Sequence, residues 1–196
     1  PPAPWYDRVP APDTWAGAAG AAGAAGAAVP WAARLAEVLD ALPELCAVVT
    51  PADPAELILC HRDLHPENVL AGEGGALVVV DWDGLGPATP ARELARALFD
   101  WFCDSSAADL GAIAALYEAY VRAGGPGRVT GLADFSMLVA SRLNFLLRQT
   151  RVALDPHAER RHRDWAEREI RESLDLMPTP AQLTAVLNIS RNISTL

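Results

Sequence analysis

The sequence predicts a predominantly helical α+β domain in which a small β-hairpin carries the polar residues. Two observations support this fold class. From residue 89 onward, apolar side chains recur at helical spacing between clear start and stop signals. Before that point, two short apolar runs flank the turn Gly72–Gly75, which is typical of a hairpin. The chain has 196 residues, 51% of them hydrophobic, which is enough for one domain with a buried core.

The first 30 residues differ in composition from the rest of the chain. They are rich in proline and then contain Gly-Ala-Ala triplets between Gly17 and Ala28, a pattern typical of a leader, a linker or a helix of small residues. We therefore expect three parts: a leader or linker at 1–30, the helical domain at 31–178, and a capped helix with a tail at 179–196.

The first elements of the domain are short. The apolar positions of 31–42 lie on one face of a helix that we expect Pro43 to close. The run at 57–60 is predicted to be a buried strand or a lead-in to one. The segments 69–70 and 77–80 are predicted to pair as the two strands of the hairpin.

Longer helices follow the hairpin. Thr89 and Pro90 supply an N-cap and a proline at the first helical position. Asp155 and Pro156 are expected to start a strongly charged helix in the same way. Thr179-Pro-Ala-Gln182 resembles a capping box for a final short helix. The predicted ranges of the four longer helices are 90–102, 107–123, 132–150 and 156–176.

The charge and cysteine content exclude several classes of protein. A net charge of −9 argues against nucleic acid as a partner, whereas a cationic small molecule or plain solubility would suit an acidic surface. The three cysteines, Cys46, Cys60 and Cys103, are scattered, which argues against a disulfide framework and favours a reducing cytoplasm. No apolar run is long enough to span a bilayer, so we expect no membrane partner.

The polar residues gather at one end of the predicted hairpin. His61, Asp63 and Asn68 precede its first strand, and Asp81 follows its second. Because antiparallel pairing returns the chain to its starting point, Asp81 should come back beside Asn68. Carboxylate and amide oxygens are the ligands that Mg²⁺ prefers. One carboxylate and one amide on a metal, with a second carboxylate nearby, suit phosphoryl transfer.

The spacing His61-x-Asp63-x-x-x-x-Asn68, followed by a hairpin and Asp81-x-Asp83, resembles the catalytic segment of the aminoglycoside phosphotransferase and choline kinase family, small-molecule relatives of the protein kinases. The resemblance covers roughly residues 57–103. It implies a protein-kinase-like C-terminal lobe that binds ATP and Mg²⁺ and transfers the γ-phosphoryl group to a hydroxyl of a small molecule. Asp63 would be the catalytic base, Asn68 and Asp81 would hold the metal and nucleotide, and His61 would brace the loop.

The chain departs from the family pattern at three points. Glu93 stands where the family usually has aspartate, and Arg62 stands where many of the antibiotic kinases have glycine. The family also has an N-terminal lobe with a glycine-rich loop and a strand lysine, but all sixteen basic residues here are arginine and only some 60 residues precede His61. We therefore expect the C-terminal lobe alone, which would bind ATP poorly and need the missing N-terminal lobe as a partner.

Two other functions remain open. The chain could be a non-catalytic, truncated kinase-like scaffold or interaction module, although nothing in the fold alone demands Asp63, Asn68 and Asp81 together. It could also be a metal-dependent hydrolase, if His61-x-Asp63-x-His65 supplied alternating ligands from an extended segment. The hydrolase would need further histidines, and those at 157 and 162 lie on a distant helix.

Each candidate also has a structural interpretation. Asp63 could cap a loop, Asn68 could be a turn residue, and Asp81 could cap a helix or face solvent. Asp83 is evenly divided between a metal role and a turn, and His65 is expected to be a packed or surface residue. The acidic residues of the last charged helix could line an acidic substrate pocket, but pairing with arginines four positions away is the default expectation; they are Asp164, Glu167, Glu169 and Glu172.

Overall fold

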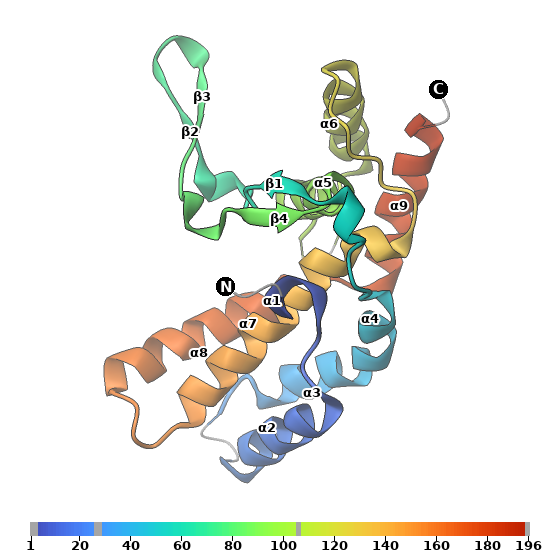
Figure 1. Cartoon of the computed structure of the whole chain (residues 1–196). Helices are drawn as coiled ribbons and strands as arrows, with labels where there is room; N and C mark the ends of the chain where they lie inside the picture. Colours follow the sequence, from blue (N-terminus) through green and yellow to red (C-terminus); the bar gives the residue numbers. More distant parts are fainter. Residues whose placement is uncertain (1–3, 26–28, 105–106, 195–196) are drawn as a thin grey trace.

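The computed structural model describes residues 4–25, 29–104 and 107–194 (Figure 1). Most of these residues are helical, and the strands are short, which agrees with the predicted α+β class. The helices are α1 (Pro4–Asp7), α2 (Pro12–Ala25), α3 (Ala32–Asp40), α4 (Leu42–Val48), α5 (Pro90–Phe102), α6 (Leu110–Arg122), α7 (Ser136–Leu154), α8 (Arg160–Asp175) and α9 (Pro180–Ser194).

Two separate antiparallel ladders lie between α4 and α5. In the predicted hairpin, β2 (Val69–Ala71) pairs with β3 (Leu77–Val79), and Val69 lies opposite Val79. In the other ladder, β1 (Ile58–Cys60) pairs with β4 (Gly86–Ala88). Figure 1 shows the β2–β3 hairpin projecting away from the helices, while β1 and β4 lie beside α5.

The main core forms between the helices. α7 lies at its centre and packs against α8, α5 and α4. Leu98 of α5, Leu143 of α7 and Ile170 of α8 are fully enclosed in this core. A smaller apolar cluster lies beneath the β1–β4 ladder and consists of Tyr6, Cys60, Ala88 and Met137. The loop that begins at residue 61 therefore leaves a strand that is held from below by the N-terminal helix and by α7.

The N-terminal segments belong to the same packed structure. The Gly-Ala-Ala triplets form the helix α2, as one of the alternatives proposed, and Trp15 of this helix is buried in the main core. α1 packs against α7. The part of the predicted leader at residues 26–28 lies outside the described residues. The domain division at residue 30 stays a prediction.

Several expected boundaries and orientations were wrong. Pro43 does not close a helix but lies in the first turn of α4. The charged helix α8 begins at Arg160 instead of residue 156, because Asp155 accepts a hydrogen bond from His157 N–H in a turn that precedes the helix. Ile58 and Leu59, in the run 57–60 expected to be a buried strand, are exposed. The helix α7 (Ser136–Leu154) is as long as the expected helix 132–150 but lies later in the chain, because residues 132–135 form a separate 3-10 turn. The helix α9 is longer than the short helix expected.

The caps of α5 and α9 are confirmed. Thr89 accepts a hydrogen bond from Arg92 N–H at 3.4 Å at the start of α5. At the start of α9, Thr179 N–H donates to Gln182 Oε1 at 3.0 Å, and Gln182 N–H donates back to the Thr179 hydroxyl at 3.2 Å. Local side-chain chemistry therefore fixed these two helix starts.

Candidate active site

His61 ties the start of the loop 61–68 to the end of β3. Its Nε2 donates to the backbone oxygen of Val80 at 2.9 Å, and its ring meets the edge of Trp82 at 4.7 Å between centroids. Nδ1 is buried without a hydrogen-bond partner among the described residues. A histidine held in this way braces the loop, as the resemblance implies, and cannot turn outward to bind a metal without losing both contacts.

Arg62 locks the same loop onto the segment that follows β3. Its backbone has a φ of 65°, a conformation that side-chain-bearing residues rarely adopt. The N–H donates to Glu93 Oε1 at 2.8 Å, and the guanidinium donates to the backbone oxygens of Gly84 at 2.6 Å and Leu85 at 3.3 Å. Glu93, the departure from the family aspartate, thus anchors the strained backbone of the loop.

Asp63 is held by a buried arginine that the sequence did not point to. Arg96 of α5 donates to Oδ1 of Asp63 and to the backbone oxygen of Arg62. Its Nε also donates to Asp100 at 3.1 Å. Burial opposes the charge of Arg96, but Asp100 and Asp63 outweigh it and raise the pKa of the guanidinium above its usual value. Arg96 is therefore a permanent cation that fixes Asp63 through one oxygen and leaves Oδ2 free of it.

The hairpin sets Asp81 close to Asn68 along the ladder. Val80 N–H donates to the backbone oxygen of Asn68 at 3.0 Å, so the residue after Val80 leaves the ladder beside Asn68. The Asn68 side chain is buried, and its Nδ2 donates to the backbone oxygen of Asp63 at 2.8 Å. Asp81 is exposed, with φ 59° and ψ 62°. Asp63, Asn68 and Asp81 thus belong to one connected segment.

The donor set at this end of the hairpin fits Mg²⁺. Nδ2 of Asn68 is turned toward Asp63, and its Oδ1 meets no hydrogen-bond donor among the described residues. Asp81 forms no ion pair in the described part of the chain. Mg²⁺ keeps several waters and takes one or two carboxylates with substrate phosphates, so an amide oxygen and one carboxylate are a sufficient protein contribution. By contrast, the described residues contain no cluster of three or more His, Cys, Asp or Glu side chains suited to a metal. The hydrolase alternative therefore gains no support.

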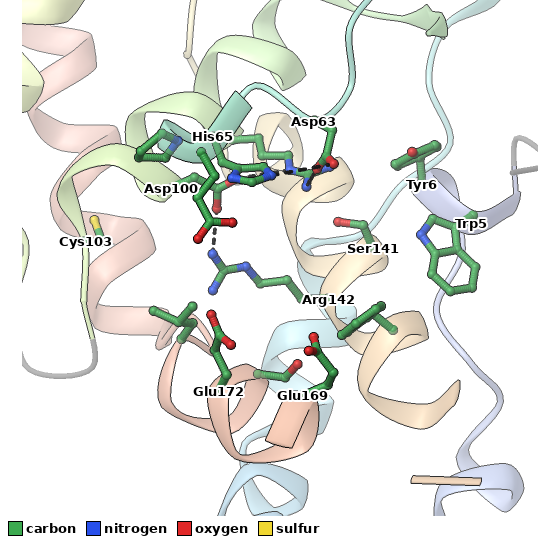
Figure 2. Close-up of a pocket in the computed structure, with 16 residues that line it drawn as sticks. Trp5, Tyr6, Asp63, His65, Asp100, Cys103, Ser141, Arg142, Glu169 and Glu172 are labelled. Atoms are coloured by element: carbon green, nitrogen blue, oxygen red, sulfur yellow. Dashed lines mark hydrogen bonds and ion pairs between the residues drawn. The ribbon is translucent and has the colours of Figure 1, made fainter. Parts of the chain in front are cut away.

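A pocket of about 570 Å³ opens beside Asp63 (Figure 2). Its walls come from α1, the loop 61–68, α5, α7 and α8. His65 also lines it, with Nε2 3.7 Å from Oδ2 of Asp63 and 3.1 Å from Asn68 Nδ2. Neither Asn68 nor Asp81 lines the pocket, which therefore lies on the far side of the loop from the hairpin.

The pocket wall formed by α8 is acidic. Glu169 and Glu172 line it together with Glu67 from the loop, whereas Asp164 and Glu167 do not. Desolvation, and after it the charges of Glu172 and Glu67, raise the pKa of Glu169 above its ordinary value. The expectation that arginines four positions away would neutralise this helix holds for Asp164, which lies 3.6 Å from Arg160. It was wrong for Glu169 and Glu172, which have no ion-pair partner among the described residues.

The opposite wall is neutralised internally. Asp100 bridges Arg96 and Arg142, with 2.6 Å to Nη2 of Arg142. Nη1 of Arg142 is buried and has no hydrogen-bond partner among the described residues. Burial raises the pKa of the nearby Cys103 thiol to about 11, so the thiol stays protonated and is a poor nucleophile. The charge available to a ligand is therefore that of the carboxylates.

Sequence reasoning missed the N-terminal contribution to this pocket. Trp5 and Tyr6 of α1 form one of its sides, beside Asp63 in Figure 2. Nothing in the spacing of residues 4–7 indicated this, because 56 residues separate Tyr6 from Asp63 in the sequence and only the folded chain brings the two together. Arg96 could have been found, since Arg96 and Asp100 stand four positions apart on α5 and form an ion pair at 3.1 Å.

A family model described as the phosphotransferase enzyme family, APH, matches residues 2–132. The matched range contains Asp63, Asn68 and Asp81 and both ladders, but it ends before α7 and α8. No curated protein and no solved structure matches the chain. Among the described residues no helix combines the length and the apolar character needed to cross a bilayer.

Proposed function

Because the chain belongs to the phosphotransferase enzyme family, as the motif resemblance predicted, we propose that it transfers the γ-phosphoryl group of ATP to a hydroxyl of a small molecule. Asp63 is proposed as the catalytic residue, and Asn68 and Asp81 as the residues that hold Mg²⁺ and, through it, the nucleotide. The observation that carries this proposal is the position of the loop 61–68, which presents Asp63 to the pocket on one side and continues to Asn68 and the hairpin on the other.

The reaction follows from what each side chain can do. Oδ1 of Asp63 is taken by Arg96, so Oδ2 accepts the hydrogen bond of the acceptor hydroxyl. The hydroxyl oxygen forms a bond to the γ-phosphorus, the bond from that phosphorus to the bridging oxygen breaks, and ADP leaves with its electrons. The hydroxyl proton passes to Asp63. Mg²⁺, when bound, offsets charge on the phosphates. In a loose transition state of this kind, orientation of the hydroxyl contributes more than its deprotonation.

The acceptor is proposed to carry a cationic group. Glu67, Glu169 and Glu172 line the pocket without ion-pair partners among the described residues, and desolvation, with a smaller contribution from the repulsion of Glu172 and Glu67, raises the pKa of Glu169. An ammonium group would relieve this repulsion. A hydroxylated amine could therefore place its hydroxyl at Asp63 and its charge at α8.

The nucleotide side is proposed to need a further protein partner. The chain has no lysine, and the arginines nearest the loop are engaged: Arg62 with backbone oxygens, Arg92 with Asp7, and Arg96 with Asp63. Among the residues that the structure describes, no unengaged cation is therefore left beside Asp81 for a triphosphate. Apolar side chains on the hairpin are also exposed, with Leu77 at 72%. A lobe that supplies basic groups and covers the hairpin, in the same polypeptide or another chain, fits both features.

The non-catalytic scaffold remains the alternative, and one experiment separates the two. Isothermal titration of Mg²⁺ with ATP against the chain should show weak binding that Asp81→Asn weakens further, and coupled detection of ADP with hydroxylated amines should show slow turnover, because the proposed partner that completes the nucleotide site is absent. Asp63→Asn should lower that turnover by roughly 10²- to 10⁴-fold, the usual contribution of a general base, while leaving nucleotide binding intact. A scaffold would bind Mg²⁺ and ATP equally in wild type and Asp81→Asn and would produce no ADP.

A further inference from the structure

Tyr6 is a buried side chain whose hydroxyl has no protein partner. The residue is 8% exposed and belongs to the small apolar cluster beneath the β1–β4 ladder. The guanidinium of Arg62 lies over its ring at 4.5 Å from the centroid and covers one face of the ring. Among the described residues the Tyr6 hydroxyl makes no hydrogen bond. The ring is buried, but the hydroxyl oxygen is not one of the fully buried polar atoms that lack a partner, so it is accessible to a molecule in the pocket.

The hydroxyl lies next to Asp63 at the pocket. Gly84 separates the two side chains: a Cβ atom placed on Gly84 would lie 3.7 Å from Cβ of Asp63 and 3.8 Å from the Tyr6 hydroxyl oxygen. Both residues line the same pocket, and Figure 2 shows them side by side at its upper edge. A Cβ on Gly84 would also lie 3.0 Å from the backbone oxygen of His61, so the absence of a side chain here allows the Tyr6 hydroxyl and Asp63 to pack closely on either side of this glycine.

The backbone around Tyr6 is fixed independently of its hydroxyl. Asn144 Nδ2 of α7 donates to the backbone oxygens of Trp5 at 3.0 Å and Arg8 at 2.7 Å. Asp7 forms an ion pair with Arg92 of α5 at 2.9 Å. Anchors on both sides hold α1 against the pocket, so the free hydroxyl is not needed to keep this helix in place. Its position therefore suits a bound molecule better than a structural role.

We propose that Tyr6 is an acceptor-binding residue: its hydroxyl donates a hydrogen bond to the oxygen of the same acceptor hydroxyl whose proton faces Oδ2 of Asp63. The inference rests on the proposed function, because that function places the acceptor hydroxyl at Asp63. An alcohol oxygen has two lone pairs, of which one would accept from Tyr6 and the other would face the phosphorus. Two contacts would then fix the direction of attack, which a single contact to Asp63 cannot do.

The protonation state of Tyr6 suits this role. Burial raises the pKa of the phenol above its ordinary value, against the smaller lowering by Arg62 and Arg96. The phenol is therefore neutral at physiological pH and can donate. A neutral phenol can donate a hydrogen bond to the acceptor oxygen without adding a charge to the pocket. It therefore does not compete with the ammonium group for the glutamates of α8.

The test measures binding of two matched amines without nucleotide. 2-Amino-1,3-propanediol and isopropylamine have the same carbon skeleton and the same charge, and they differ by two hydroxyl groups. We expect the chain to bind the diol more tightly, and Tyr6→Phe to reduce that preference by roughly two- to tenfold, the range for one neutral hydrogen bond. Tyr6→Phe keeps the ring beneath Arg62. Tyr120→Phe is the control, because its hydroxyl accepts from Gly127 N–H instead of facing the pocket.

A second measurement covers the case in which Tyr6→Phe does not fold. In the wild-type chain labelled with ¹³C at the tyrosine ring, the Tyr6 resonance should shift with the diol and stay in place with isopropylamine. Equal affinity for the two amines in the wild type, or an unchanged preference in a folded Tyr6→Phe, would overturn the inference. Because no nucleotide is present, these outcomes are independent of ADP formation, whose absence would count against the proposed function alone.

Discussion

The pocket beside Asp63 and the β2–β3 hairpin lie on opposite sides of the loop 61–68 and are held together in different ways. The pocket side is enclosed: Asp63 is gripped by Arg96, and Arg96 in turn by Asp100, on helices whose inner faces form the main core. On the hairpin side, Asp81 has no ion pair among the described residues and Leu70 is 51% exposed. An isolated two-stranded hairpin is only marginally stable in water.

This difference separates two steps that an enzyme of this family must combine. The proposed acceptor residues lie on or beside helices that pack in the main core, whereas the proposed metal ligands Asn68 and Asp81 lie at the base of the projecting hairpin, just before β2 and just after β3 (Figure 1). Substitutions on the pocket side should therefore change the free energy of unfolding strongly. Substitutions on the hairpin side should change ligand binding with little effect on stability.

The largest expected difference is between Arg96→Met and Asp81→Asn. Removing Arg96 leaves Asp63 without its cation and Asp100 with Arg142 alone, and a broken buried ion pair costs about 3–5 kcal/mol. Asp81 is exposed and unpaired among the described residues, so Asp81→Asn should stay within about 0.5 kcal/mol of the wild type. Urea denaturation followed by circular dichroism measures both. If the two variants lost similar amounts of unfolding free energy, the pocket side and the hairpin side would contribute equally to stability, and the comparison would fail.

A smaller contrast lies between two glycines. A Cβ at Gly86 would lie 2.4 Å from Cζ of Arg62, whose guanidinium is tied to Gly84 and Leu85, so Gly86→Ala should displace Arg62 and cost about 1–3 kcal/mol. A Cβ at Gly20 in α2 would meet no atom within 4 Å. Gly20→Ala should stabilise the chain by about 0.5–1 kcal/mol, because alanine favours the helix. Thermal unfolding of the two variants checks the opposite signs, and a neutral Gly86→Ala would mean that Arg62 is free to move.

The sequence predicted what depends on neighbours along the chain. The caps at Thr89 and Thr179 and the β2–β3 hairpin follow from local side chains and turn residues, and so does the approach of Asp81 to Asn68. The β1–β4 ladder was not predicted, because Gly86-Pro-Ala88 has no strand pattern and its partner lies 28 residues earlier.

The same limit applied to the site. The contacts of Asp63 with Arg96, across 33 residues, and of the pocket with Tyr6 depend on tertiary packing. The expectation that Glu169 and Glu172 would pair with arginines was wrong for the same reason. Helical spacing shows which residues on a helix can pair, but it does not show which face of the helix lines a cavity. Local motifs therefore pointed to the candidate site residues, while the residues that hold them and shape the pocket required the fold.

The smallest expected effect is the pH dependence of cation binding on the pocket side. Burial raises the pKa of Glu169 in the folded chain, so on lowering the pH its carboxylate is protonated before an ordinary glutamate would be. Since the raised pKa means that the charged form is disfavoured in the fold, Glu169 destabilises the chain at neutral pH and ceases to do so as the pH falls. A bound ammonium group offsets this destabilisation, because it favours the charged form of Glu169.

Isopropylamine should therefore bind more weakly as the pH falls from 7 toward 4.5. Glu169→Gln should weaken the binding of isopropylamine at pH 7 by roughly two- to fivefold and should make that binding less dependent on pH. Asp164→Asn, on the same helix but outside the pocket, is the control. Calorimetric titration at several pH values measures both variants, and an unchanged pH profile in Glu169→Gln would place the cation elsewhere.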